Sequence, residues 1–157
     1  MLKKVVKNKA KLAKGHRIAI VASRYNSKYV DSMLRAAKKE LAQSKVSIEI
    51  VRVPGAFEIP TVASALAIRL SKPVEAIICL GVIIRGETTH AEHIGNSVTN
   101  ALMQLQVDHV LPVVHDVLLL ENIEQAKQRF LDGSCNRGLE AARTAIEMVR
   151  IMGRLTA

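Results

Sequence analysis

The chain has 157 residues, 49% of them hydrophobic, which is enough for one domain with its own core and no stabilising disulfide or metal. No apolar stretch approaches the length of a membrane span, and no signal-peptide core follows the first lysines. Seven of the nine net positive charges lie in residues 1–17, which hold no acidic residue, and the rest of the chain is close to neutral. With only four aromatic residues in all, the chain is not expected to bind nucleic acid as its main function.

The basic segment and the two cysteines bear on domain organisation and compartment. We expect residues 1–14 to form a basic, partly disordered leader and residues 15–157 to form a single domain. Cys79 falls in an apolar run and Cys135 in a glycine-containing turn, and neither has the spacing of a disulfide or zinc motif. The sequence therefore predicts a cytoplasmic protein that is not associated with a membrane.

The first half of the domain reads as two strand-helix units. Residues 18–23 are a short apolar strand, and the apolar side chains from Val30 to Leu41 recur at helical spacing. Residues 46–53 read as a second strand that Pro54-Gly55 ends. The pattern predicts a second helix over Phe57–Leu70.

The second half repeats this alternation. An apolar run over residues 76–84 precedes a helical pattern from Ile94 to Leu105, and a fourth strand is expected over 110–118. Asn122 can cap a short helix that reaches Phe130, and a long final helix follows with Leu139, Ala142, Ile146 and Val149 on its buried side. Four alternating units predict an α/β fold, a flavodoxin-like three-layer α/β/α sandwich with a four-stranded parallel sheet.

Every predicted strand brings polar residues to its carboxyl end. They are Arg24-Tyr25-Asn26, Gly55–Glu58, Arg85–His90 and, at the fourth strand, His115-Asp116. Ligands of open α/β sheets bind beyond the carboxyl ends of the strands. We therefore expect all four groups to line one crevice.

The turn before the third helix suggests a phosphate site. Gly86 permits close backbone approach, and the amides near Glu87 and Thr88 at the start of a helix attract anions. His90 could move protons near neutral pH. A capped helix with a surface histidine would show the same pattern, so this interpretation depends on the convergence of the other groups.

Other groups allow more than one interpretation. Tyr25 and Phe57 could stack on a flat heterocycle and Glu58 could accept hydrogen bonds, although Phe57 also suits a core and Glu58 a helix start. Arg129 and Arg137 flank a turn where an anion could bind. No metal site is predicted, because the HxxH pair formed by His90 lacks a third ligand, and no nucleotide-binding glycine motif occurs.

The chain resembles one family, the 6,7-dimethyl-8-ribityllumazine synthases. The resemblance runs in order from Gly15 to Met152, and its most specific parts are the PGAFE and RGxTxH motifs. The segments that carry it are Pro54–Pro60, Leu80–His90, Glu121–Ala126 and Ala145–Met148.

The resemblance implies an activity and an assembly. The family condenses 5-amino-6-ribitylamino-uracil with 3,4-dihydroxy-2-butanone 4-phosphate without a cofactor, through an imine, elimination of phosphate and ring closure in riboflavin biosynthesis. It implies a flavodoxin-like subunit in homo-oligomers, either pentamers or icosahedral shells of pentamers, with active sites shared between neighbours. The turn around Gly133 has no insertion, which favours a shell, and riboflavin synthase is the implied protein partner.

The resemblance also implies roles for residues of one subunit. The pyrimidine would be bound by Tyr25, through stacking, by Asn26, and by the backbone of Val82, Ile83 and Ile84. The ribityl chain would be held by Ala56, Phe57 and Glu58. The phosphate would be bound by the amides of Gly86, Glu87 and Thr88, beside His90 as the proton-transfer group.

A neighbouring subunit would complete the site. The resemblance implies that His115 covers the ring, Arg129 pairs with the phosphate and Arg137 lies close to the substrates, while Glu140 orients His90. The family commonly has a large aromatic residue in place of His115 and often a lysine in place of Arg137. An imidazole ring stacks less strongly on a substrate ring than a large aromatic side chain does. His115 therefore motivates a rival hypothesis, a non-catalytic relative that binds a flavin or lumazine on the same fold.

Overall fold

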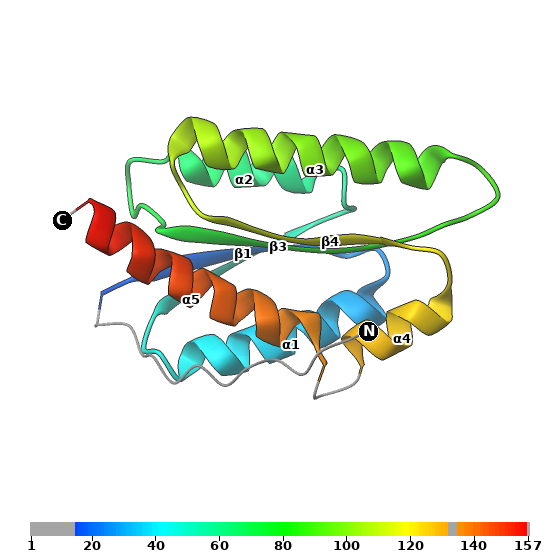
Figure 1. Cartoon of the computed structure of the whole chain (residues 1–157), viewed down its shortest axis with the longest axis horizontal. Helices are drawn as coiled ribbons and strands as arrows, with labels where there is room; N and C mark the ends of the chain where they lie inside the picture. The colour runs from blue at the N-terminus through cyan, green and yellow to red at the C-terminus, as the bar shows by residue number, and fades with distance from the viewer. Residues whose placement is uncertain (1–14, 132–134, 157) are drawn as a thin grey trace.

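The computed structural model describes residues 15–131 and 135–156, so the predictions for the leader and for the turn around Gly133 lie outside the described residues. Figure 1 shows one sheet between two layers of helices. Its strands, all parallel and in the order β2-β1-β3-β4, are β1 (Arg17–Ser23), β2 (Ser47–Val53), β3 (Ala76–Ile84) and β4 (Val113–Leu120). The helices are α1 (Ser27–Ala42), α2 (Ile59–Ala67), α3 (His90–His109), α4 (Ile123–Phe130) and α5 (Arg137–Leu155).

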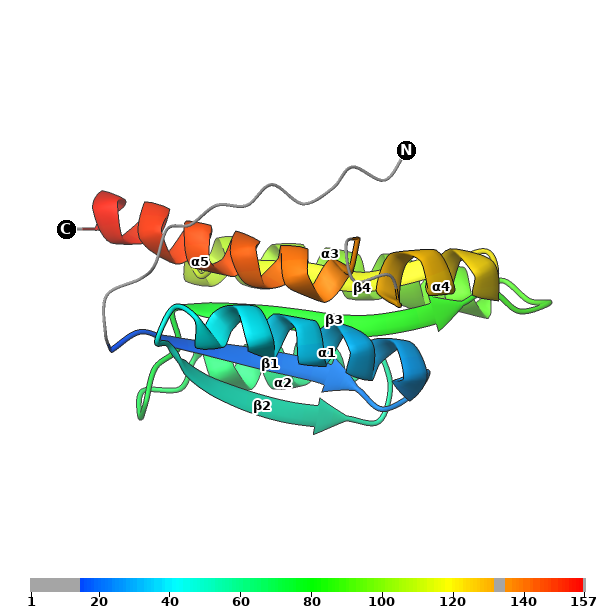
Figure 2. The same ribbon diagram turned by 90° about the horizontal axis from the view of Figure 1, so that it is seen from below.

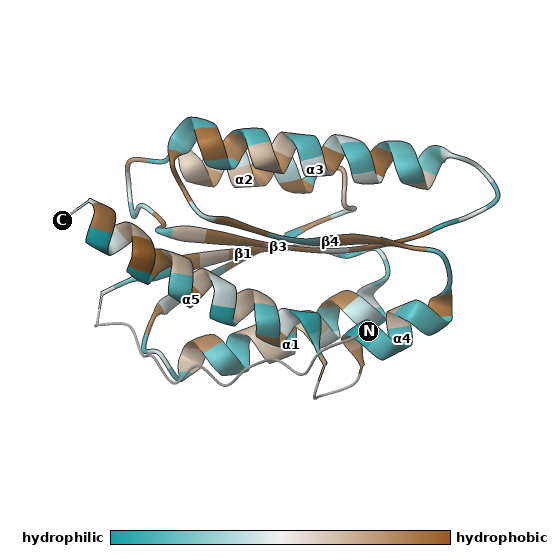
Figure 3. Ribbon diagram, in the orientation of Figure 1, coloured by the Kyte–Doolittle hydropathy of each residue, from teal (hydrophilic) through white to brown (hydrophobic). Residues whose placement is uncertain are grey.

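The helix layers explain why the central strands are apolar. Helices α1, α4 and α5 cover one face of the sheet, and α2 and α3 cover the other, as Figures 1 and 2 show. Strands β1 and β3 are therefore buried on both faces, and Figure 3 shows brown, apolar strands between helices with polar outer faces. The α/β fold with a four-stranded parallel sheet predicted from the sequence is confirmed.

Two element boundaries differ from the prediction. Helix α2 starts at Ile59 because the preceding residues form a turn in which the Gly55 amide donates to Glu58 Oε2 at 2.9 Å. Strand β4 starts at Val113 because α3 continues to His109 and Val110 ends that helix in the left-handed conformation, with φ 50°.

The later start of β4 corrects the prediction for His115 and Asp116. These residues pair in register with Cys79 and Leu80, in the middle of β3, and β4 continues to Leu120. They therefore do not lie at the carboxyl edge of the sheet with the other three polar groups. The prediction that all four groups meet at one edge is wrong for this pair.

The strand order places a crevice between β1 and β3. The chain runs outward from β1 to β2 and then returns past β1 to β3, and such a reversal is where open α/β sheets bind ligands. Backbone hydrogen bonds hold the ends of β1 and β2 together beyond the sheet, from Arg24 N to Val53 O at 2.8 Å and from Tyr25 N to Pro54 O at 3.0 Å. The turns that follow these strands are thus fixed relative to each other.

Helices α1 and α5 touch through their backbones. Gly138 is buried in the first turn of α5, and a Cβ at this position would lie 2.0 Å from the carbonyl oxygen of Met33 in α1. Asn136 fixes the start of α5, because its side chain accepts a hydrogen bond from the Gly138 amide at 2.9 Å and donates to Phe130 O at 2.6 Å. Only glycine permits this helix spacing.

The backbone contact predicts a large effect for Gly138→Ala. The added methyl group has no room unless the helices separate, so we expect a loss of about 3 kcal/mol or more in the free energy of unfolding. Gly153→Ala, in the same helix with nothing within 4 Å of the new Cβ, should be neutral or stabilising by up to about 1 kcal/mol. Urea-induced unfolding of both variants measures the difference, and equal effects would contradict the close contact.

Candidate active site

A cleft of about 420 Å³ lies where β1 and β3 end and where α2 and α3 begin. Two exposed aromatic side chains, Tyr25 at 74% and Phe57 at 61%, line it. Its apolar lining comes from Ala56, Val82, Ile83, Ile84, Ala91 and Ile94, and its polar side chains are those of Glu58, Thr88 and His90. Exposed rings beside an apolar surface suit a flat heterocycle, which would bury them on binding.

Asn26 joins the first strand to the third beneath this cleft. It adopts the left-handed conformation with φ 55°, which asparagine tolerates better than most residues, and so turns the chain from β1 into α1. Its Nδ2 donates to the Val82 carbonyl oxygen at 2.7 Å. Asn26 thus fixes the position of the adjacent Tyr25 relative to the apolar lining of β3.

The turn into α3 offers donors for an anion. Among the described residues, the amides of Gly86, Glu87 and Thr88 donate to no protein acceptor. They precede a helix of 20 residues, whose N-terminus carries partial positive charge. Glu87 is exposed beside the cleft, and His90 is the first residue of the helix.

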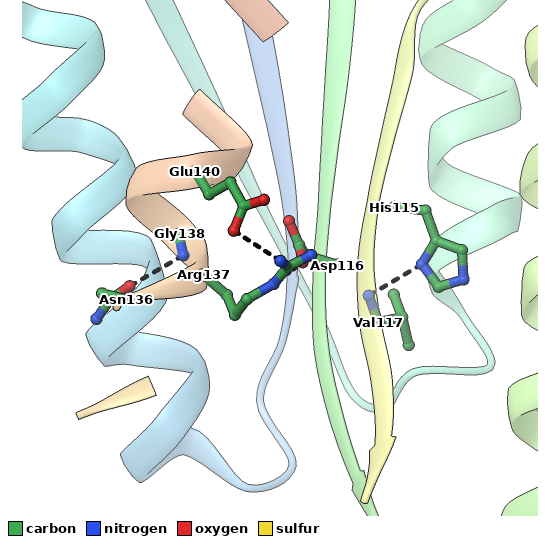
Figure 4. Close-up of polar contacts among 7 residues, drawn as sticks. All are labelled: His115, Asp116, Val117, Asn136, Arg137, Gly138 and Glu140. Atoms are coloured by element: carbon green, nitrogen blue, oxygen red, sulfur yellow. Dashed lines mark hydrogen bonds and ion pairs between the residues drawn. The ribbon is translucent and has the colours of Figure 1, made fainter. Parts of the chain in front are cut away.

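A second group of predicted site residues lies elsewhere, in a groove of about 370 Å³ along β4 between α3 and α5. His115, Arg137 and Glu140 line this groove, and so does Asp116. Successive residues of a strand point to opposite faces. In Figure 4, His115 accordingly points toward α3 and Asp116 toward the start of α5.

Hydrogen bonds fix His115 as a neutral ring. Its Nδ1 accepts from the Val117 amide at 3.0 Å (Figure 4). Its Nε2 lies 2.8 Å from Thr99 Oγ1, which itself donates to the Gly95 carbonyl and therefore accepts from the ring. Burial lowers the pKa of His115, which favours the same neutral form.

Arg137 is held between two carboxylates (Figure 4). Its Nε donates to Asp116 Oδ1 at 2.9 Å and its Nη1 donates to Glu140 Oε2 at 2.6 Å. Burial raises the pKa of Asp116 to about 6, although the Arg137 charge opposes this shift. The sequence indicates Asp116 only as a single acid within an apolar strand, which predicts no role for it.

The chain thus brings one set of the predicted residues together and leaves another apart. All the residues expected to bind the pyrimidine and ribityl groups line the cleft or, like Asn26, support it. Glu140 does not contact His90 within the chain, because it bonds to Arg137 in the groove. Arg129 lies half-buried on α4 and forms no ion pair or hydrogen bond among the described residues.

Two further observations concern the described part of the chain only. Residues 15–131 and 135–156 contain no cluster of three or more His, Cys, Asp or Glu side chains arranged to bind a metal ion. None of the helices in these ranges combines the length and apolar composition that crossing a membrane requires.

Comparison with known proteins agrees with the geometry. The family model of 6,7-dimethyl-8-ribityllumazine synthase matches residues 15–153. The chain belongs to this family. Among proteins named 6,7-dimethyl-8-ribityllumazine synthase, one from Stenotrophomonas maltophilia K279a is 39% identical over 142 residues, which cover 88% of this chain and 90% of that protein. Another, from Syntrophus aciditrophicus SB, is 40% identical over 148 residues, or 92% of this chain and 94% of that protein.

The buried carboxyl of this lumazine synthase family member predicts a pH-dependent stability. Because the pKa of Asp116 is raised from 3.8 to about 6, the folded protein binds more protons than the unfolded chain between these values, and the Asp116 contribution to stability is lost as pH rises. Relative to Asp116→Asn, the free energy of unfolding of the unmodified protein should fall by up to about 3 kcal/mol across this window. Denaturant titrations at several pH values measure the free energy of unfolding of both proteins. A difference between them that does not change with pH would show that the pKa of Asp116 is not raised.

Proposed function

We propose that the protein catalyses the condensation of 5-amino-6-ribitylamino-uracil with 3,4-dihydroxy-2-butanone 4-phosphate to 6,7-dimethyl-8-ribityllumazine, with release of phosphate and water, in riboflavin biosynthesis. The observation that carries this proposal is the cleft itself. It places aromatic rings, an apolar surface, free helix amides and His90 around one space large enough for two small substrates. These groups suit an addition of an amine with proton transfer and loss of phosphate.

The chemistry needs alignment and proton transfer. The amine of the pyrimidine attacks the ketone carbonyl, and one water leaves as the imine forms. Phosphate is then eliminated, which leaves a second carbonyl group after tautomerisation. The ribitylamino nitrogen attacks that carbonyl carbon, and the ring closes with loss of a second water. Tyr25 stacks on the pyrimidine and Glu58 accepts from the ribityl hydroxyls, which holds the amine beside its target. His90 accepts and returns protons in these steps, for which a general acid-base group contributes about 10²–10⁴-fold.

The phosphate requires charges that the cleft lacks. No lysine or arginine is among the described residues that line it, and only the amides of the α3 N-terminus face the anion. We propose that the groove side of a neighbouring subunit completes the site, with its Arg129 on the phosphate, its His115 over the ring and its Arg137 near the substrates. A neighbour's Glu140 is then the carboxylate that orients His90.

This shared site implies a homo-oligomer. We propose a pentamer, assembled further into an icosahedral shell, that acts in the cytoplasm and associates with riboflavin synthase. A non-catalytic flavin- or lumazine-binding relative is not favoured, because the cleft keeps the proton-transfer histidine and the amides for a leaving phosphate. An absorbance assay with both substrates distinguishes the two, since only the enzyme forms the lumazine chromophore.

The role of His90 predicts a specific loss of turnover. His90→Ala should lower kcat by about 10²-fold or more, because the proton-transfer group is lost from the cleft. His93→Ala is the matched control, since His93 is exposed in the same helix and is not among the residues that line the cleft. Lumazine formation followed by absorbance measures both variants, and near-normal turnover of His90→Ala would remove His90 from this role.

The role of Arg129 predicts a selective effect on one substrate. Arg129→Ala should raise KM for the phosphate substrate by about tenfold or more, because a charge-assisted contact with the phosphate is lost. Lys127→Ala removes a charge from the same helix, but Lys127 pairs with Glu124 at 2.6 Å and should leave KM unchanged. An effect of Arg129→Ala on the pyrimidine alone would show that the phosphate assignment is incorrect.

A further inference from the structure

The two arginines of the proposed site differ in their surroundings. Arg129 has no acidic partner among the described residues. Arg137 has two, Asp116 and Glu140, and its side chain is 26% exposed. A shared role in binding phosphate would not require this difference, so the two positive charges have different tasks.

The contacts of Arg137 fix its guanidinium in one orientation. Both Nε and Nη2 lie against the same Asp116 oxygen, at 2.9 and 2.8 Å, and Nη1 lies 2.6 Å from Glu140 Oε2. Asp116 is only 2% exposed and pairs in register with Leu80 in the middle of the β3–β4 ladder, so the sheet fixes its position. Further N–H groups of the guanidinium remain for a ligand.

The charges of this cluster do not favour an anion. Near neutral pH Asp116 is mostly ionised, since burial raises its pKa only to about 6, and the cluster holds two carboxylates and one guanidinium. A phosphate group would meet net negative charge there, in a groove that is partly shielded from water. A carbonyl or hydroxyl group would still find a well-placed donor.

We propose that Asp116 is a positioning residue that, with Glu140, cancels the charge of Arg137 and fixes it as a hydrogen-bond donor to uncharged oxygens of the substrates. The phosphate is thereby left to Arg129 and the N-terminus of α3. This inference rests on the proposed function, in which Arg137 of one subunit faces the substrates of the next.

Binding of inorganic phosphate tests the charge balance directly. Asp116→Asn keeps the shape of the side chain and an acceptor for Arg137 but removes one negative charge. Calorimetric titration of the full-length protein with inorganic phosphate, at neutral pH and fixed ionic strength, should show binding about fivefold tighter than in the unmodified protein. Structural damage would weaken phosphate binding. Tighter binding by Asp116→Asn would therefore show that Asp116 acts on the charge of Arg137 and does not only support the fold.

Matched variants assign this gain to Arg137. In the Arg137→Ala background, Asp116→Asn should produce no gain in phosphate affinity. Glu147→Gln removes one negative charge from α5, where Glu147 pairs with Arg150 as Glu140 pairs with Arg137, and it should leave phosphate affinity unchanged. If Asp116→Asn does not fold, Glu140→Gln should give a smaller gain, because Glu140 is the more exposed partner at 45%.

The steady-state assay supplies a second readout. Arg137→Ala should lower kcat while changing KM for the phosphate substrate less than about threefold, in contrast to Arg129→Ala. Unchanged phosphate affinity in both Asp116→Asn and Glu140→Gln would overturn the inference, and so would a gain that persists without Arg137. If the unmodified protein forms no lumazine, the proposed function fails, and the phosphate titrations still decide whether Asp116 cancels the charge of Arg137.

Discussion

The hydrogen bond from Asn26 to the Val82 carbonyl joins the two strands between which the chain reverses its direction of travel across the sheet. The reversal separates the turns after β1 and β3 and opens a space between them, and the hydrogen bond ties the start of one turn to the end of β3. The contact helps to place Tyr25 relative to the apolar lining of β3, together with the pairing of β1 with β3 and the bond from the Tyr25 amide to Pro54 O. The amides before α3 then face the same space because β3 ends beside it.

Much of this arrangement could be predicted from the sequence because it depends on patterns of burial. Strands covered on both faces require continuous apolar runs; the RGxTxH turn directly follows one such run, β3, and the PGAFE turn directly follows the edge strand β2. The strand ends therefore indicated the lining of the cleft, including Phe57 and His90. Asn122 was also correctly predicted as a helix cap, since its side chain accepts from the Gln125 amide at 3.0 Å.

The sequence failed where a residue acts against its usual preference. Val110 is apolar and β-branched and reads as part of a strand, yet it ends α3 in the left-handed conformation. That error moved β4 along the chain and placed His115 and Asp116 at the wrong level of the sheet. The partnership of Asp116 with Arg137 and Glu140 could not be predicted either, because it depends on how α5 packs beside β4.

The backbone contact between α1 and α5 also limits how sequences with this fold can diverge. An overlap between two side chains can be relieved by a second substitution that makes one of them smaller. At Gly138 the obstacle is the peptide backbone of Met33, which every amino acid shares, so no compensating substitution at residue 33 can make room for a side chain. Arg137 is the adjacent residue, so the contact at Gly138 also fixes the backbone from which Arg137 reaches Asp116 and Glu140. Substitutions in this cluster must therefore fit a backbone position that cannot shift.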